Sequence, residues 1–240
     1  MIPEKKAPEI LVLIFAASFP TLAAWVYFVL FSGESWMLTL GALSKLVQFA
    51  LPAVWIWLVL RQPRRIGGVS TRDLLSGALS GLVILAACLG LYYGYIKHHP
   101  AFSASPQALG EKLKGLGADT PGGFLVVALF YSLIHSLLEE YYWRWFVYGR
   151  ARHYLGIARA NLLASLAFMA HHVVVINTFL PGEYFWSLTI PLSLSVAVGG
   201  VIWSVLYQRS GSLYGAWLSH ALVDVAIMIC GYDMYFGGGS

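Results

Sequence analysis

Apolar stretches of about 20 residues recur along the whole chain, and they constrain its fold more than any other feature. About 20 mainly apolar residues are needed for a helix to cross a bilayer, where the backbone has to satisfy its own hydrogen bonds. The 240 residues are 59% hydrophobic and only 11% charged, whereas soluble domains are roughly one quarter charged. We place seven spans at residues 9–31, 41–60, 74–96, 122–147, 161–180, 187–207 and 213–231. The sequence therefore predicts an all-α, polytopic transmembrane helical bundle of about seven to eight spans.

The predicted spans leave no room for a separate soluble domain. Residues 1–240 are therefore expected to form one membrane-embedded domain, and the glycine-rich residues 237–240 a flexible tail or tag remnant. The one long polar connection, residues 97–121, contains Leu109, Leu113 and Leu116 at helical spacing. This spacing is typical of a short amphipathic helix on the membrane surface, although a plain loop fits equally well.

Basic residues are distributed unevenly between the two ends of these spans. Eleven of the 15 lysines and arginines fall on the side of the N-terminus. The other four are Lys45, Lys97, Lys112 and Lys114. By the positive-inside rule the N-terminus is predicted to be cytoplasmic. Because the basic residues lie in short loops beside apolar spans, the net charge of +4 does not indicate nucleic-acid binding.

Three short motifs place ionisable residues inside predicted spans, where such groups are costly and are candidates for function. They are Glu139-Glu140-x-x-x-Arg144, Phe168-x-x-x-His172 and His220-x-x-x-Asp224. Glu139 is about eight residues from the cytoplasmic end of its span, His172 about twelve and His220 about seven. At 1.5 Å per residue they lie roughly 10 to 18 Å deep. Three helices are thus expected to bring ionisable groups to one level of the bilayer.

Helical spacing separates the two adjacent glutamates. Glu140 and Arg144 are four residues apart, a spacing at which a glutamate and a following basic residue pair well. Glu139 points about 100° away from that pair. Glu140 is therefore predicted to be structural, and Glu139 to be free for general acid or base chemistry.

The same spacing argument applies to the histidines. Phe168 lies four residues before His172 and shares its helix face, which favours His172 over His171 as the working residue. His220 and Asp224 are also four residues apart. The carboxylate of Asp224 is therefore expected to hold the imidazole or to act beside it.

Other residues in these spans have simpler interpretations. Trp143, Trp145 and Tyr148 are expected to form part of the aromatic belt at the cytoplasmic interface. Gly199 and Gly200 predict a face of close helix packing.

Taken together, the three motifs resemble those of the CPBP family, the CAAX-protease and bacteriocin-processing (Abi) family of glutamic intramembrane proteases. The resemblance covers residues 122–231 approximately. It implies a helical bundle with a water-accessible cavity and no cofactor or metal. In such a site Glu139 and His172 would activate a water molecule that attacks a peptide carbonyl, and His220 and Asp224 would stabilise the oxyanion. Three residues would support the site: Glu140, Arg144 and Phe168.

The resemblance also implies partners and a location. The partners would be membrane lipid and a membrane-anchored or lipidated peptide or protein, without nucleic acid. The location would be the cytoplasmic membrane of a prokaryote. Many family members carry Asn at the position of Asp224, and an amide can donate to an oxyanion whereas an ionised carboxylate cannot. Asp224 is therefore either protonated or serves to orient His220.

Two alternatives come from other functional classes. A metal-dependent hydrolase could use His135, Glu139, His172 and His220 as ligands, since His135 and Glu139 are four residues apart, although the HExxH signature is absent. A transporter or a non-catalytic scaffold could instead use the same polar cluster for proton transfer or binding.

Overall fold

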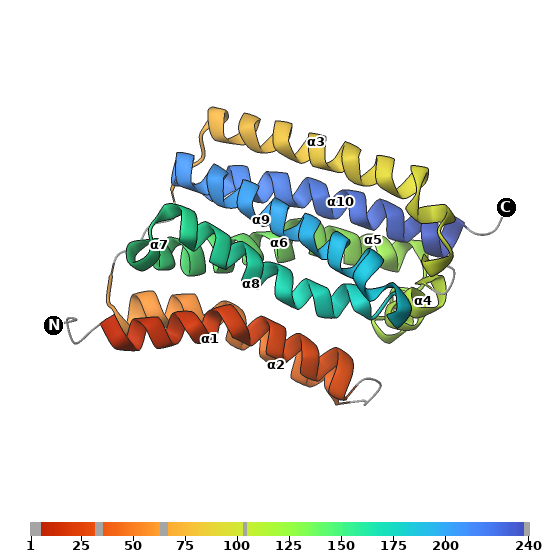
Figure 1. Ribbon diagram of the computed structural model, residues 1–240, viewed down its shortest axis with the longest axis horizontal. Helices are drawn as coiled ribbons and strands as arrows, with labels where there is room; N and C mark the ends of the chain where they lie inside the picture. The colour runs from red at the N-terminus through yellow and green to blue at the C-terminus, as the bar shows by residue number, and fades with distance from the viewer. Residues whose placement is uncertain (1–5, 32–35, 63–66, 103–104, 238–240) are drawn as a thin grey trace.

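Seven long apolar helices dominate the computed structural model, which describes residues 6–31, 36–62, 67–102 and 105–237. Within these residues no strand occurs. The candidate membrane spans are Ala7–Leu30, Leu38–Val59, Thr71–His98, Pro121–Leu155, Ile157–Asn177, Gly182–Ser210 and Tyr214–Phe236 (Figure 1). The all-α transmembrane fold class is confirmed, and the protein is an integral membrane protein.

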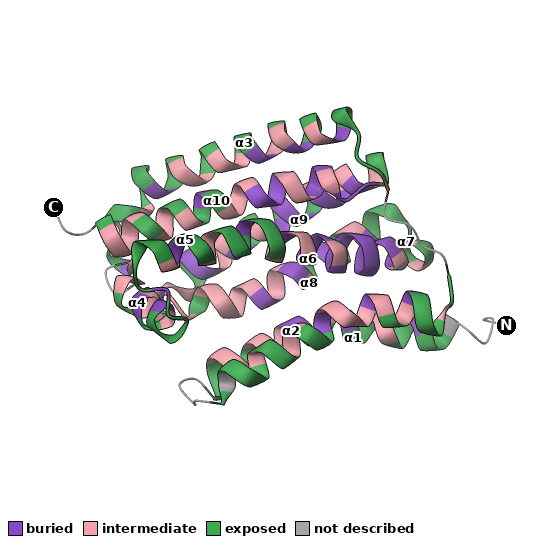
Figure 2. Cartoon of the chain, turned by 180° about the vertical axis from the view of Figure 1, so that it is seen from behind, coloured by how far each residue is buried: buried purple, intermediate pink, exposed green. Residues whose placement is uncertain are grey.

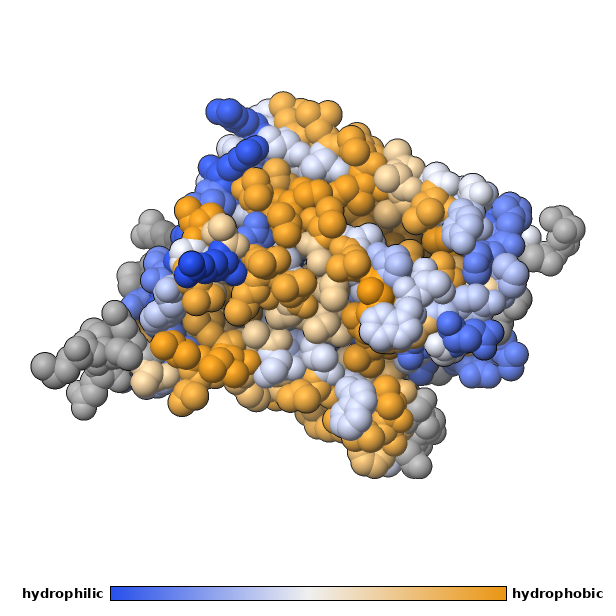
Figure 3. Space-filling model, viewed as in Figure 1, coloured by the Kyte–Doolittle hydropathy of each residue, from blue (hydrophilic) through white to orange (hydrophobic). Residues whose placement is uncertain are grey.

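The surface agrees with this assignment. Figure 3 shows apolar residues across the middle of one face and hydrophilic residues towards both ends. The assignment of residues 1–240 to one domain stays a prediction, as does the cytoplasmic N-terminus. Residues 238–240 of the predicted tail lie outside the described part of the chain, as do Lys5, Arg64 and Arg65 of the charge count.

The helices lie side by side in the order that Figures 1 and 2 show, with the N-terminal hairpin at one edge of the bundle and α3 at the other. The hairpin consists of α1 (Lys6–Trp25) and α2 (Met37–Ala53), each continued by a short π-helical segment. The third span is α3 (Thr71–Gly94). Between these edges lie α8 (Ile157–Asn177), α9 (Ile190–Ser210) and α10 (Tyr214–Phe236).

The fourth span changes its helical winding several times. It starts as α5 (Pro121–Leu129), where Thr120 caps the first turn by accepting a hydrogen bond from the Gly123 N–H. A π-helical segment (Phe130–His135), α6 (Ser136–Glu140), a second π-helical segment (Tyr141–Tyr148) and α7 (Gly149–Leu155) follow. The span therefore continues to Leu155, beyond its predicted end at residue 147. Gly156, with φ of 78°, makes the turn into α8.

Glycines attach α3 to α10 at the edge of the bundle. A methyl group on Gly77 would lie 2.1 Å from the carbonyl oxygen of Gly215, and one on Gly81 would lie 2.9 Å from Cα of Ser219. The Gly77-x-x-x-Gly81 spacing is typical of close helix contacts in membranes. Asp73 adds a hydrogen bond, since its carboxylate accepts from the Gly215 N–H at 3.0 Å.

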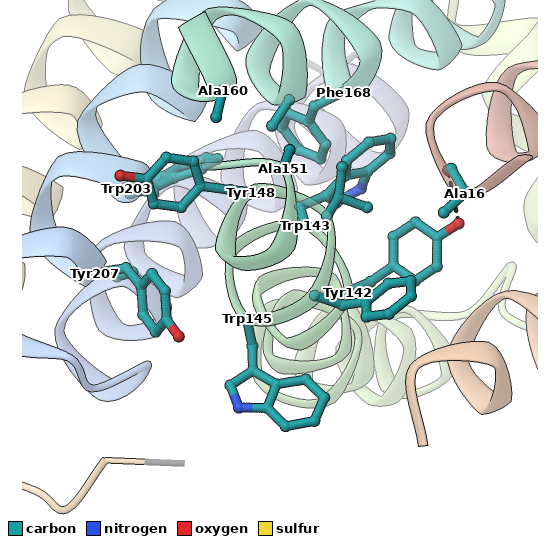
Figure 4. Packing of buried hydrophobic residues seen from close by; sticks show 14 of the residues in the cluster. Ala16, Tyr142, Trp143, Trp145, Tyr148, Ala151, Ala160, Phe168, Trp203 and Tyr207 are labelled. Carbon is teal, nitrogen blue, oxygen red and sulfur yellow. Dashed lines mark hydrogen bonds between the residues drawn. The ribbon is translucent and has the colours of Figure 1, made fainter. Parts of the chain in front are cut away.

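Polar contacts attach α1 to the fourth span. The Tyr142 hydroxyl donates to the carbonyl oxygen of Ala16 at 2.7 Å (Figure 4). Glu9, which is buried, forms an ion pair with Arg150 and accepts a hydrogen bond from the Tyr154 hydroxyl at 2.6 Å. These contacts satisfy polar groups that would otherwise be costly beside lipid.

Aromatic residues of the second π-helical segment in the fourth span form part of the core. Trp143, Trp145 and Tyr148 are 0% exposed and pack with other buried residues of the central cluster (Figure 4). The prediction that they form an interfacial belt was wrong, because the helix continues to Leu155 and its neighbours enclose this segment. The predicted packing face of α9 is present, since a methyl group on Gly200 would lie 3.1 Å from the side chain of Ser165 on α8.

The polar connection contains the predicted short helix, α4 (Ser105–Gly115). Contrary to the prediction, Leu109 and Leu113 do not face a membrane surface. Leu113 is buried and packs with Leu109 in a cluster that includes Tyr235 and Phe236 at the end of α10, while Leu116 is exposed. The apolar face of α4 therefore covers protein.

Candidate active site

Glu139 and Glu140 occupy α6, the short α-helical segment between the two π-helical segments of the fourth span. π-Helical segments are frequent at functional sites, since their wider turn changes which side chains share a helix face. Glu139 is 4% exposed and Glu140 is 0% exposed. Both adjacent carboxylates thus point into the protein interior, although an ideal α-helix would separate them by about 100°.

Three histidines surround the carboxylate of Glu139. His135 Nε2 lies 3.9 Å from one carboxylate oxygen and His171 Nε2 lies 3.7 Å from the same oxygen. His220 Nε2 lies 3.7 Å from the other oxygen. These separations exceed the length of a hydrogen bond. None of the three imidazoles therefore holds the Glu139 carboxylate by a hydrogen bond.

Glu140 is held much more tightly. Its carboxylate accepts a hydrogen bond from His220 Nδ1 at 2.8 Å. Its other oxygen lies 3.3 Å from Nε of Arg144, which is the predicted ion pair. The guanidinium of Arg144 is buried between two aromatic rings, 4.8 Å from the ring centre of Phe168 and 5.0 Å from that of Trp203. A cation on aromatic faces is stabilised by their quadrupoles.

His220 on α10 connects the two carboxylates. With Nδ1 bonded to Glu140, its Nε2 faces Glu139 and also lies 3.7 Å from the carboxylate of Asp224. The hydrogen bond that fixes the ring therefore comes from Glu140, and Asp224 stands beside the ring. Trp203 of α9 stacks on the imidazole with 3.9 Å between ring centres. The indole N–H of Trp203 donates to the Ser219 hydroxyl at 3.0 Å.

The two adjacent histidines of α8 have different neighbours. His172 packs against the ring of Phe168, with 4.6 Å between ring centres, and its Nδ1 lies 2.9 Å from the Phe168 carbonyl oxygen. This is the shared face that the spacing predicted. His171 is the histidine that the structure places within 4 Å of Glu139. The two imidazole rings lie 4.1 Å apart, so both belong to the cluster.

Sequence reasoning missed three parts of this site. His171 was set aside because Phe168 does not share its helix face. Trp203 and Ser219 were not singled out, since neither belongs to a motif. Their contacts join α9 to α10, and local spacing carries no information about contacts between helices.

A metal site would require several ligands to converge. In the part of the chain that the structure describes, no group of three or more His, Cys, Asp or Glu residues is arranged to hold a metal ion. The four ligands of the metal-hydrolase alternative, His135, Glu139, His172 and His220, are therefore not arranged as such a group.

Comparison with known proteins identifies the region that carries the motifs. Residues 121–226 match the family model described as type II CAAX prenyl endopeptidase Rce1-like. The family that this model describes is the CPBP family. The family resemblance predicted from the motifs is thereby confirmed, and the match includes every motif residue from Glu139 to Asp224. No curated protein and no solved structure gives a significant match.

The family indicates a CAAX protease, which is a peptide hydrolase, working in a lipid environment on a peptide substrate. Together with the apolar spans it makes the protein a membrane-embedded hydrolase. The matched region starts at Pro121, so α1 to α4 lie outside it.

Proposed function

We propose that the protein is a glutamic intramembrane endopeptidase that cleaves a prenylated, CAAX-type peptide near the cytoplasmic half of the bilayer. The single observation that carries the proposal is the environment of Glu139. Its carboxylate is almost fully buried, and three imidazole nitrogens face it at 3.7 to 3.9 Å without reaching hydrogen-bond length. A buried carboxylate whose oxygens are not tied down is free to accept a proton from a bound substrate water.

In the proposed reaction, Glu139 removes a proton from water while an imidazole of α8 orients it. The resulting hydroxide adds to the scissile carbonyl carbon, and the carbonyl oxygen becomes an oxyanion. When the intermediate collapses, the C–N bond breaks, and Glu139 returns the proton to the leaving amine. The family motif assigns the orienting role to His172, whereas the distance to Glu139 favours His171.

His220 is the proposed donor to the oxyanion. Its Nδ1–H donates to Glu140, which leaves Nε2 directed towards Glu139 and Asp224. With a proton on Nε2, the imidazolium donates to the oxyanion where charge develops. Asp224 then stabilises that proton or, if protonated itself, donates as the amide of Asn does in many family members.

The remaining parts of the proposal concern orientation and substrate. The excess of basic residues on one side supports a cytoplasmic N-terminus. The proposed location is the cytoplasmic membrane of a prokaryote. The description of the matched family supports a prenylated C-terminal peptide as the substrate class.

Peptide cleavage tests the proposal directly. Purified protein in liposomes is expected to cut a prenylated CAAX peptide that carries a fluorophore and a quencher, and Glu139→Gln is expected to abolish the signal. Insensitivity to chelators would separate this mechanism from a metal hydrolase. A Glu139→Gln variant that cuts at the wild-type rate would exclude the proposed role of Glu139.

A second comparison tests which histidine of α8 orients the water molecule. His172→Ala and His171→Ala are to be measured in the same assay, with folding checked by size-exclusion chromatography. The motif predicts a loss of 10²-fold or more for His172→Ala. A larger loss for His171→Ala would transfer the orienting role to the histidine that lies nearer Glu139.

A further inference from the structure

Lys45 is a cation inside the membrane that the proposed mechanism does not use. The charge count places it at the outer end of its span, but it lies in α2, eight residues into the candidate span Leu38–Val59. It is partly buried. An ionisable residue at such a position is costly and marks a candidate binding site.

The side chain of Lys45 extends towards the middle of the bilayer. Its Nζ lies 3.3 Å from Oε1 of Gln48 and 5.6 Å from the ring centre of Phe49, both one turn further along α2. Long side chains on helices normally lean back towards the N-terminus, and a lysine that snorkels extends towards the nearer membrane surface. Lys45 does neither. Among the described residues, no carboxylate lies within ion-pair distance of its Nζ.

A short path of side chains joins Lys45 to the candidate active site. The ring of Phe49 packs edge-on against that of His135, with 6.0 Å between ring centres. Nε2 of His135 lies 3.9 Å from the Glu139 carboxylate. The charge of Lys45 interacts electrostatically with both Glu139 and His171. One layer of side chains thus separates Lys45 from the proposed base.

We propose that Lys45 binds the C-terminal carboxylate of the peptide substrate and so determines specificity for a free chain end. This inference rests on the proposed function. A CAAX sequence ends three residues beyond its modified cysteine, and an extended tripeptide spans about 10 Å. That length suits a path that leads from Glu139 past His135 and Phe49 to Lys45. A carboxylate within the membrane requires a cation, because an unpaired charge is strongly disfavoured there.

The test compares two substrates that differ only at the chain end. One prenylated CAAX peptide ends in a free carboxylate and the other in a carboxamide. Wild-type protein is expected to cleave the acid with a kcat/KM about 10- to 100-fold higher, mainly through KM, since hydrogen bonds to charged groups are the stronger ones. Lys45→Met is expected to abolish this preference, and Lys45→Arg to retain most of it.

Lys114→Met is the matched control, because Lys114 is exposed on α4 and away from the site. It is expected to keep the wild-type preference for the acid. Equal cleavage of both peptides by wild-type protein would overturn the inference while leaving the protease intact, and so would a preference that persists in Lys45→Met. Failure of wild-type protein to cleave either peptide would instead refute the proposed function, and the inference with it.

Discussion

Glu139 and Glu140 are neighbours in sequence with opposite surroundings. Glu140 is fully enclosed, accepts a 2.8 Å hydrogen bond from His220 and lies 3.3 Å from the Arg144 guanidinium. Glu139 is almost as buried, yet the three imidazole nitrogens around its carboxylate lie 3.7 to 3.9 Å away, beyond hydrogen-bond distance. Burial alone therefore does not separate a structural carboxylate from a reactive one.

The difference lies in how each carboxylate is compensated. A buried carboxylate that is paired with a cation and accepts a hydrogen bond holds its partners in place, and removing one partner leaves an uncompensated charge. Glu140 is in this position, and through His220 Nδ1 it also fixes the ring that faces Glu139. Glu139 has oxygens that substrate groups can use. One glutamate thus organises the site and the other is available for the reaction.

Glutamine in place of each glutamate tests this contrast most strongly. Glu139→Gln removes the proposed base and should lower the cleavage rate by at least 10²- to 10⁴-fold, with the melting temperature close to wild type, because no tight contact is lost. Glu140→Gln should lower both activity and melting temperature, since it leaves the Arg144 charge uncompensated. Cleavage and thermal unfolding are to be measured in the same detergent. A Glu139→Gln variant as destabilised as Glu140→Gln would remove the distinction.

Arg144→Ala tests the same ion pair by removing its cation. The change leaves the Glu140 carboxylate buried without its ion pair, which costs about 3–5 kcal/mol of unfolding free energy. Denaturant titration of the purified variant measures this loss. Arg144→Lys serves as the control, since it keeps the charge but loses the planar contact with Phe168 and Trp203. Unchanged stability together with lost activity would mean that Arg144 contacts the substrate.

Much of the fold could be predicted because apolar length is a local property. All seven spans were located, and their ends differ by at most five residues except for the fourth span, which continues eight residues beyond its predicted end. The π-helical segments on either side of α6 were not predicted, because helix winding depends on how neighbouring helices pack. The same limit explains the error at Trp143 and Trp145, since aromatic composition alone does not distinguish an interface from a core.

The site could be predicted where its contacts lie within one helix. Spacing of four residues gave the pairs Glu140–Arg144 and Phe168–His172, and both contacts are present. The hydrogen bond from His220 to Glu140 joins different helices, and no spacing rule indicates it. Sequence spacing therefore gave the members of the site but not the bond that orients His220.

Asp224 offers the finest test of the contrast, because it lies beside His220 without holding it. Its carboxylate is 3.7 Å from Nε2, while Glu140 fixes the ring through Nδ1. Asp224→Asn keeps a hydrogen-bonding group of the same size and should retain substantial activity. Asp224→Ala should lose about 100-fold, as for one oxyanion-hole donor, and His220→Ala should be at least as damaging. Cleavage by all three variants is to be measured across pH, with folding checked in parallel. An Asn variant as inactive as Ala, with folding intact, would show that the carboxylate itself is required, and proton transfer or metal binding by Asp224 would replace the oxyanion role.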